Sequence, residues 1–287
     1  MTIISRRSFL QMTGVAIGST LISSPQDHLF DEAGETVLGR PFKTTPVFRT
    51  QKIDATSVRY LWPDVPIPVL AEDSGWYQVN GGYVLREAIQ PMYQRESSVD
   101  EIVLPTWGEV CGAVASVRSW CAADAPLVTR IGHGGVIRLL DYLPGEPFGW
   151  FGVGYESGNL LGWSQASNWV AIELLQEQAF ITQVRLKMDT SELQIYQDDE
   201  LLLTVPFSSG KLIAAGSYTI QKGAIGSTYK AFEGVPWRLQ FGDYEAAGAY
   251  WHNQFGKPAD GTAVQITPLI ARWVYESLHD ESQFIVE

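Results

Sequence analysis

The sequence has little of what metal-dependent, nucleotide-dependent or membrane-spanning proteins use. Only two cysteines and four histidines occur in 287 residues, and the scattered histidines match no metal-ligand spacing. No glycine-rich phosphate-binding loop is present, and beyond the N-terminal segment no apolar run reaches membrane length. These absences predict that the protein has no metal site, no cofactor and no membrane domain after that segment.

Positive charge is also scarce. Lysine and arginine number 20 against 32 aspartates and glutamates, which gives a net charge of −12. Nucleic acids and anionic membrane surfaces are bound by basic patches, so we expect no nucleic-acid partner. The hydrophobic content of 45% is ordinary for a folded protein. The length exceeds one typical domain and predicts two or three.

The two cysteines, Cys111 and Cys121, lie close together in the sequence. In an exported protein an even cysteine count permits a disulfide. Free buried thiols are the alternative.

The first residues carry an export-like pattern. The run S-R-R-S-F-L-Q around Arg6 and Arg7 is followed by an apolar stretch from Met12 to Ile22. It resembles the twin-arginine export signal, S-R-R-x-F-L-K, and we expect residues 1–28 to be such a signal. Because no small-x-small cleavage site is clear, this segment is either removed or kept as a membrane anchor. The expected location is extracytoplasmic, in the cell wall or at the cell surface.

Two small β-domains are predicted after a linker. Residues 29–50 carry turn formers without periodicity and are interpreted as the linker. In residues 51–95, Asn80-Gly81 separates two β-rich runs, which predicts a hairpin. Residues 100–170 repeat the order of a V-R strand, a W-Y/F strand and a G-Y/W strand, with turn residues at 156–159.

The pattern W-Y-x-V followed by G-Y-V resembles bacterial SH3-like (SH3b) domains, modules that commonly accompany cell-wall enzymes. The resemblance implies one small SH3-like barrel in residues 51–95 and a second in residues 100–170. The alternative is that any two β-hairpins share such patterning. His133 lies in a Gly-rich turn of the second copy and receives no role.

Residues 180–287 predict more strands and a helix. Residues 182–188 alternate apolar and basic side chains, as in a half-buried strand, and Asp198-Asp199 marks the turn of a hairpin. Thr267-Pro268 combines a capping oxygen with proline at the first helical position. Apolar residues then fall on one helix face: Leu269, Ile270, Trp273, Val274 and Leu278. The predicted fold class is therefore mainly β.

The stretch from Ala247 to Ile266 reads A-G-A-Y-W-H-N-Q-F-G-K-P-A-D-G-T-A-V-Q-I. It resembles the active-site segment of the L,D-transpeptidase (YkuD-type) family, H-G-x-Y-W-H-N-x-F-G-x-P-x-S-H-G-C-V-N-L. Residues 180–280 resemble that family's catalytic domain, with Ser208-Ser209-Gly210 in place of its S-T-G. The resemblance implies a β-rich domain with a C-terminal helix, and peptidoglycan (stem peptide or glycan) as the partner.

The residues that carry this family's chemistry are replaced. Ala263 stands at the nucleophilic Cys, Asp260 and Gly261 at the preceding Ser-His pair, and Ala247 at an earlier His. Acyl transfer by cysteine needs a thiolate, a base and oxyanion donors, and a methyl group cannot attack a carbonyl. We therefore expect a catalytically degenerate, exported cell-envelope protein. Its groove residues are those that match the family: Tyr250, Trp251, His252, Asn253 and Phe255.

Two other functions are consistent with the sequence. The first is an active L,D-transpeptidase with Thr262 as the nucleophile and His252 or Asp260 as its base. Against it, His252 is also interpreted as a ring that packs on Trp251 and hydrogen-bonds to backbone. The second is a module that binds a protein partner through the SH3-like domains.

Overall fold

The structure, a computed structural model, describes residues 37–93, 102–174, 179–260 and 263–287. Strands account for 54% of the chain and helix for 7%, which confirms the mainly β fold class. The export-like segment with Arg6 and Arg7 lies outside the described residues. The chain divides into two compact units: Met1–Tyr93 with Leu203–Val205, and Gln94–Leu202 with Pro206–Glu287.

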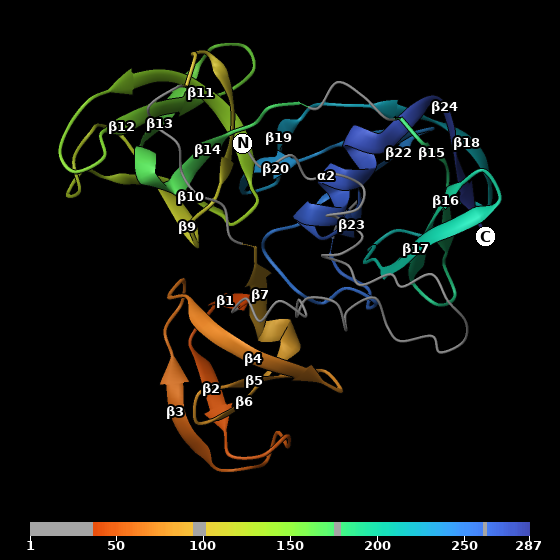
Figure 1. Cartoon of the computed structure of the whole chain (residues 1–287), viewed down its shortest axis with the longest axis horizontal. Helices are drawn as coiled ribbons and strands as arrows, with labels where there is room; N and C mark the ends of the chain where they lie inside the picture. The colour runs from red at the N-terminus through yellow and green to blue at the C-terminus, as the bar shows by residue number, and fades with distance from the viewer. Residues whose placement is uncertain (1–36, 94–101, 175–178, 261–262) are drawn as a thin grey trace. The chain divides into compact units, whose positions relative to one another are not determined.

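The first unit contains a seven-stranded sheet in the order β3-β2-β6-β5-β4-β1-β7 (Figure 1, orange). Its buried core includes Val47, Val69 and Tyr77. The predicted hairpin at Asn80-Gly81 is confirmed, and Gly81 supplies the positive φ of 87° that the turn needs. The strands are β1 Val37–Pro41, β2 Thr45–Phe48, β3 Ser57–Leu61, β4 Ile67–Asp73, β5 Trp76–Val79, β6 Gly82–Leu85 and β7 Ile89–Met92, with a 3₁₀ turn, η2, at Arg86–Ala88.

The linker prediction for residues 29–50 is wrong in residues 37–48. These residues form β1 and β2, and β1 is hydrogen-bonded to both β4 and β7. Turns were predicted for this segment because it contains Pro41 and Pro46, and proline usually interrupts a sheet. The first β-domain therefore includes residues that were assigned to the linker.

A second seven-stranded sheet opens the second unit, in the order β10-β9-β13-β12-β11-β8-β14 (Figure 1). Strands β8 to β14 correspond, in chain order, to strands β1 to β7, so the two sheets have the same strand order. A 3₁₀ turn, η3 at Ala166–Asn168, precedes the last strand as in the first copy. The strands are β8 Thr106–Val110, β9 Val114–Arg118, β10 Leu127–Gly132, β11 Val136–Leu143, β12 Trp150–Gly154, β13 Leu160–Gln165 and β14 Trp169–Ala171.

The predicted internal repeat is real, although one pair of strands was matched incorrectly. Trp76 and Trp150 occupy equivalent positions opposite Leu85 and Gln165. The two V-R runs are not equivalent, because Val58-Arg59 lies in β3 whereas Val117-Arg118 lies in β9, the counterpart of β2. A two-residue sequence motif is too short to distinguish one strand from its neighbour.

The C-terminal part of the chain forms an eight-stranded sheet, ordered β17-β16-β15-β24-β18-β21-β22-β23. The predicted strand and hairpin at residues 182–207 and the predicted helix are all present. Thr267 Oγ1 caps the helix by accepting from the Ile270 N–H at 3.4 Å. The elements are β15 Ile181–Lys187, β16 Glu192–Gln197, β17 Glu200–Pro206, β18 Gly216–Lys222, β19 Gly226–Tyr229, β20 Phe232–Pro236, β21 Leu239–Phe241, β22 Tyr244–Gly248, β23 Ala263–Ile266, α2 Pro268–Ser277 and β24 Leu278–Val286.

Within this unit, the second sheet packs against the C-terminal elements. The hairpin of β19 and β20 contacts β10 and β11, and Tyr250 belongs to the buried core cluster of the second sheet. On helix α2, the Arg272 guanidinium is 2.8 Å from the fully buried carboxylate of Glu109 in β8. The second β-domain is thus joined to the C-terminal sheet by both apolar packing and an ion pair.

Neither cysteine forms a disulfide: Cys111 and Cys121 are both free and half-buried. Burial raises the pKa of the Cys121 thiol. Among the helices of the described residues, none is both long and apolar enough to cross a membrane.

Candidate functional site

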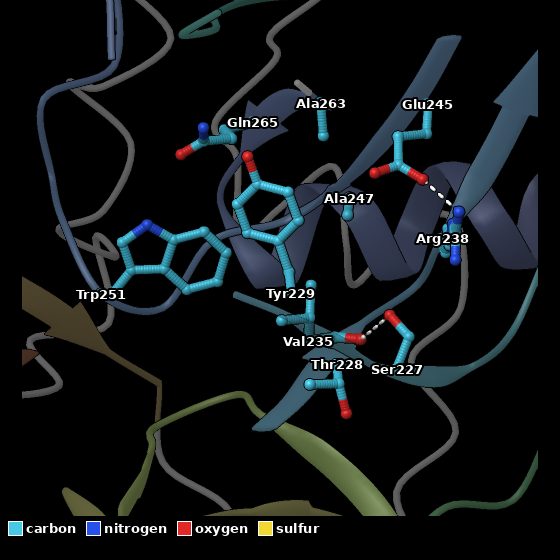
Figure 2. Close-up of a pocket in the computed structure, with 10 residues that line it drawn as sticks. All are labelled: Ser227, Thr228, Tyr229, Val235, Arg238, Glu245, Ala247, Trp251, Ala263 and Gln265. Carbon is cyan, nitrogen blue, oxygen red and sulfur yellow. Dashed lines mark hydrogen bonds and ion pairs between the residues drawn. The ribbon is translucent and has the colours of Figure 1, made fainter. Parts of the chain in front are cut away.

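The segment from Ala247 to Ile266 begins in β22 and ends in β23, and these two short strands pair in parallel. In β22 and β23, Glu245 lies opposite Ala263, and Ala247 lies opposite Gln265. A small cavity of about 20 Å³ opens beside them (Figure 2). This is room for about one water molecule. Its lining comes from β22, β23, the β19–β20 hairpin and the chain after each: Ser227, Thr228, Tyr229, Val235, Arg238, Glu245, Ala247, Trp251, Ala263 and Gln265.

Two of the residues singled out from sequence, Ala247 and Ala263, contribute methyl groups to the cavity wall. Ala247 is 6% exposed and Ala263 is 4% exposed, and both line the cavity. Because the two strands run parallel in adjacent register, substitutions at these positions change the same cavity wall. The structure therefore brings together two alanines that lie sixteen residues apart in the sequence (247 and 263).

An ion pair lies at one side of the cavity. The Arg238 guanidinium pairs with the Glu245 carboxylate (Figure 2). Both residues also line a second, more open groove of about 420 Å³, together with Lys211, Gln240, Gly242, Asp243 and Tyr244. The cavity and the groove therefore meet at this pair, and both signs of charge border the groove.

Arg238 is held there by a strained backbone. The preceding residue, Trp237, is fully buried and has a φ of 59°, in the left-handed region that bulky side chains avoid. Its N–H donates to the Ile225 carbonyl at 2.8 Å, and the Arg238 N–H donates to Ala224 at 3.0 Å. Such strain persists only where surrounding contacts impose it, and it is common at functional sites.

Stacked aromatic rings form the opposite wall. Trp251 stacks on Phe232 with ring centroids 4.3 Å apart and on Tyr229 at 6.2 Å. Figure 2 shows the Tyr229 ring between the Trp251 and Ala247 side chains. The neighbouring Tyr250 turns away from the cavity, since its hydroxyl donates to the Glu233 carbonyl at 2.5 Å. The β19–β20 hairpin thus carries one ring to the cavity wall and supports another.

His252 uses both ring nitrogens within the protein. Nδ1 accepts from the Gln254 N–H at 3.1 Å, so Nε2 carries the proton and donates to Gln265 Oε1 at 2.6 Å. Burial lowers the pKa of this imidazole, and the hydrogen bond to Gln265 opposes that effect only in part. The ring also packs on Phe255, with centroids 4.8 Å apart. His252 is therefore neutral near pH 7 and already fully hydrogen-bonded.

Ser208, from the S-S-G run, is built into the same region. It is 1% exposed, and its backbone exchanges two hydrogen bonds with that of Gln265, at 2.8 and 2.9 Å. Its hydroxyl donates to the Gln254 carbonyl at 2.9 Å. These bonds fix Gln265, and through it His252, but leave the Ser208 oxygen inaccessible as a nucleophile.

The described lining holds no thiol or imidazole. Its one serine, Ser227, donates to the Val235 carbonyl at 3.2 Å, and Thr228 donates to a Glu233 carboxylate oxygen at 2.6 Å. Covalent acyl transfer requires a nucleophile next to an available base. Among the described residues around the cavity, no such pair exists. The described residues also contain no group of three or more His, Cys, Asp or Glu that could hold a metal.

The residues proposed from sequence fall into three groups. Ala247, Ala263 and Trp251 line the cavity. His252 reaches it only through Gln265, and Asn253 and Phe255 are buried. Asp260 is exposed, with its backbone carbonyl accepting from the Gln265 side chain at 3.2 Å, and Gly261 and Thr262 lie outside the described residues.

Sequence reasoning missed seven of the ten lining residues, and four of these carry the aromatic, charged and amide groups of the site: Tyr229, Arg238, Glu245 and the buried Gln265. Gln265 was noted only as a mild replacement at the end of the motif. The other three belong to strands and turns that carry no local motif, and only the sheet register places them at the cavity.

No protein-family model matches the chain, and no curated protein gives a significant match. Solved structures that match include an L,D-transpeptidase from Mycobacterium tuberculosis, 13% identical, with a TM-score of 0.34, covering 65% of this chain and 96% of that one. Another, from Mycobacterium smegmatis, is 11% identical with a TM-score of 0.31, covering 64% of this chain and 100% of the other.

A third match is a fused zinc-dependent amidase/peptidase/peptidoglycan-binding domain-containing protein from Clostridium acetobutylicum. It is 15% identical, with a TM-score of 0.28, and the match covers 36% of this chain and half of the other. At these scores the likenesses carry no argument about the activity of this chain.

Proposed function

We propose that this protein is an exported cell-envelope protein with a degenerate L,D-transpeptidase-like site, which binds peptidoglycan without reacting with it. The observation that carries the proposal is the cavity beside β22 and β23, which shares Arg238 and Glu245 with the groove of about 420 Å³. It lies at the segment Y-W-H-N-x-F-G-x-P, and methyl groups of Ala247 and Ala263 line it. An aromatic wall and a charged border remain, and both suit a peptide or glycan ligand.

The hydrogen bonding of His252 weighs against the alternative of an active enzyme. A base for Thr262 needs a free acceptor nitrogen, whereas Nδ1 accepts from Gln254 and Nε2 donates to Gln265. Binding of a protein partner by the two repeats is a separate proposal, and it concerns the first repeat.

Export through residues 1–28 is part of the proposal. Its support is the sequence pattern around Arg6 and Arg7. Replacing both by lysine keeps the charge but removes the pattern, so secretion of the double variant is expected to fail.

Binding is tested by sedimentation of the protein with purified cell-wall sacculi. Trp251→Ala removes the ring that lines the cavity and stacks on Tyr229 and Phe232. Loss of such a stacking ring is expected to weaken sedimentation about tenfold. The matched control is Trp120→Ala, a ring that is 54% exposed in the turn between β9 and β10. Equal sedimentation of the two variants would reject the cavity as the binding site.

A further inference from the structure

The two repeats can be compared residue by residue along their first hairpins. The Arg49 N–H donates to the Thr56 carbonyl, just as Ser119 donates to Pro126. Later in the same stretch, the bond from the Asp64 N–H to Pro41 corresponds to the bond from Gly134 to Val110. Residues 43–73 therefore align with residues 113–143 without a gap.

The corner between the third and fourth strands differs sharply in the two repeats. In the second repeat, residues 131–137 are buried and the corner is G-H-G-G. The hairpin of β19 and β20 approaches it closely, since a Cβ on Gly226 would lie 2.3 Å from the Val136 carbonyl oxygen. The first repeat has W-P-D-V at this corner, and Trp62 and Val65 are 69% and 52% exposed. In the first repeat, exposed side chains thus occupy a corner that glycines form in the second repeat.

The strand that leads into this corner, β3, forms one end of the first sheet (Figure 1). Val58 and Tyr60 in this strand and Trp62 directly after it are exposed, at 41%, 60% and 69%. An end strand presents backbone N–H and C=O groups that no neighbouring strand satisfies, and natural proteins usually protect such edges. In the second repeat, the positions of Tyr60 and Trp62 hold Arg130 and Gly132.

Cations flank this edge at both ends. Lys43 precedes Thr45, which pairs with Leu61 near the corner. Arg49 and Lys52 lie in the turn at the other end, where Phe48 pairs with Ser57. All three are exposed, and among the described residues no ion pair engages their charged groups. Their counterparts in the second repeat are uncharged: Ala113, Ser119 and Ala122.

We propose that the free edge of β3 binds an extended acidic peptide, which adds a strand to the first sheet. The backbone edge supplies ladder hydrogen bonds, Tyr60 and Trp62 supply cross-strand packing, and the flanking cations meet carboxylates. A peptide fits better than a sugar chain, because only another backbone satisfies the row of N–H and C=O groups. In residues 37–93 lysine and arginine slightly outnumber aspartate and glutamate, so this unit does not repel an acidic partner.

The probe is a fluorescein-labelled decapeptide of alternating valine and glutamate, titrated against the full chain by anisotropy. Tyr60→Ser/Trp62→Ser removes the exposed rings, and Lys43→Glu/Lys52→Glu reverses two flanking charges. We expect either double variant to weaken binding about tenfold or more. The control Val128→Ser/Arg130→Ser alters the equivalent edge of the second repeat and is expected to leave affinity within about twofold. Circular dichroism checks that each variant is folded.

Three outcomes would overturn the proposal. One is no saturable binding of the decapeptide. Another is equal binding of the same peptide N-methylated at every second residue, which cannot form the ladder. The third is displacement by the anionic polysaccharide hyaluronan together with equal affinity of the Tyr60→Ser/Trp62→Ser variant. Loss of affinity both on N-methylation and in that variant supports strand addition.

Discussion

The hydrogen bonds of His252 give this motif residue a structural role. In the segment Y-W-H-N it matches an active-site family, yet its two nitrogens hold Gln254 and Gln265 in place. Gln265 in turn bonds to the backbone of Ser208 and Asp260. The ring therefore organises the turn that follows β22. A structural role of this kind explains how the motif remains while the cavity beside it is lined by methyl groups.

Placing a thiol at position 263 is therefore not expected to create transpeptidase activity. Ala263→Cys, made in a Cys111→Ser/Cys121→Ser background, places one thiol in the cavity wall. Without a free base beside it, the variant should release no D-alanine from a disaccharide tetrapeptide. After unfolding, a methanethiosulfonate reagent should label this single thiol, which checks that it is present and reduced. Release of D-alanine would show that His252 can leave Gln265 and act as a base.

The pH dependence of stability follows from the buried imidazole. Burial lowers the folded-state pKa of His252 below the ordinary value of about 6.5. Below that value the unfolded chain binds the proton first, so this residue contributes stability above about pH 6.5 and loses it as pH falls toward its folded pKa. Urea midpoints measured across this range should fall less in His252→Gln than in the wild type. An identical slope in both proteins would contradict the assignment.

At the scale of elements, strong local signals predicted structure well. The Asn80-Gly81 turn, the hairpin at Asp198-Asp199 and the cap at Thr267 all lie where the sequence indicated. Each depends on a few adjacent residues whose backbone preferences are decisive. Strands β1 and β2 were missed because Pro41 and Pro46 obscured their alternation.

Long-range pairing explains what local reasoning could not supply. Ala247 and Ala263 meet because β22 and β23 pair in parallel, and Arg238 reaches the cavity from the turn before β21. No property of either segment alone encodes that register. The motif therefore located the site in the chain, and the sheet determined which neighbours complete it.

The contact between helix α2 and strand β8 should be energetically important. Arg272 bonds both to Glu109, which is fully buried, and to Glu276, at 2.8 Å each. Arg272→Met leaves a buried carboxylate without this partner and should lower the free energy of unfolding by about 3–5 kcal/mol. Urea denaturation measures this, and adding Glu109→Gln should recover part of the loss.

A matched control is available on the same unit. Arg185 pairs with Glu287 at 3.8 Å, but the two side chains are 36% and 46% exposed. Arg185→Met should therefore cost less than about 1 kcal/mol. If the two arginine variants lose equal stability, the Glu109 pair does not join β8 to α2 as described.

At the scale of the molecule, two copies of one sheet topology have taken different roles. The second copy is packed into the C-terminal part, since Tyr250 belongs to its core cluster and the β19–β20 hairpin covers its corner. That hairpin also carries Tyr229 to the cavity, so the second copy supports the candidate site. The first copy keeps an exposed edge at β3. Divergence between the repeats thus separates a supporting role from a binding role.

The most direct test of the account is mass spectrometry of the wild-type protein incubated with a disaccharide tetrapeptide. Under native conditions the account predicts a non-covalent complex whose ligand keeps its full mass. Loss of terminal D-alanine, a covalent adduct or a cross-linked dimer would contradict it, because each requires a nucleophile next to a free base, and the described cavity lining contains no such pair.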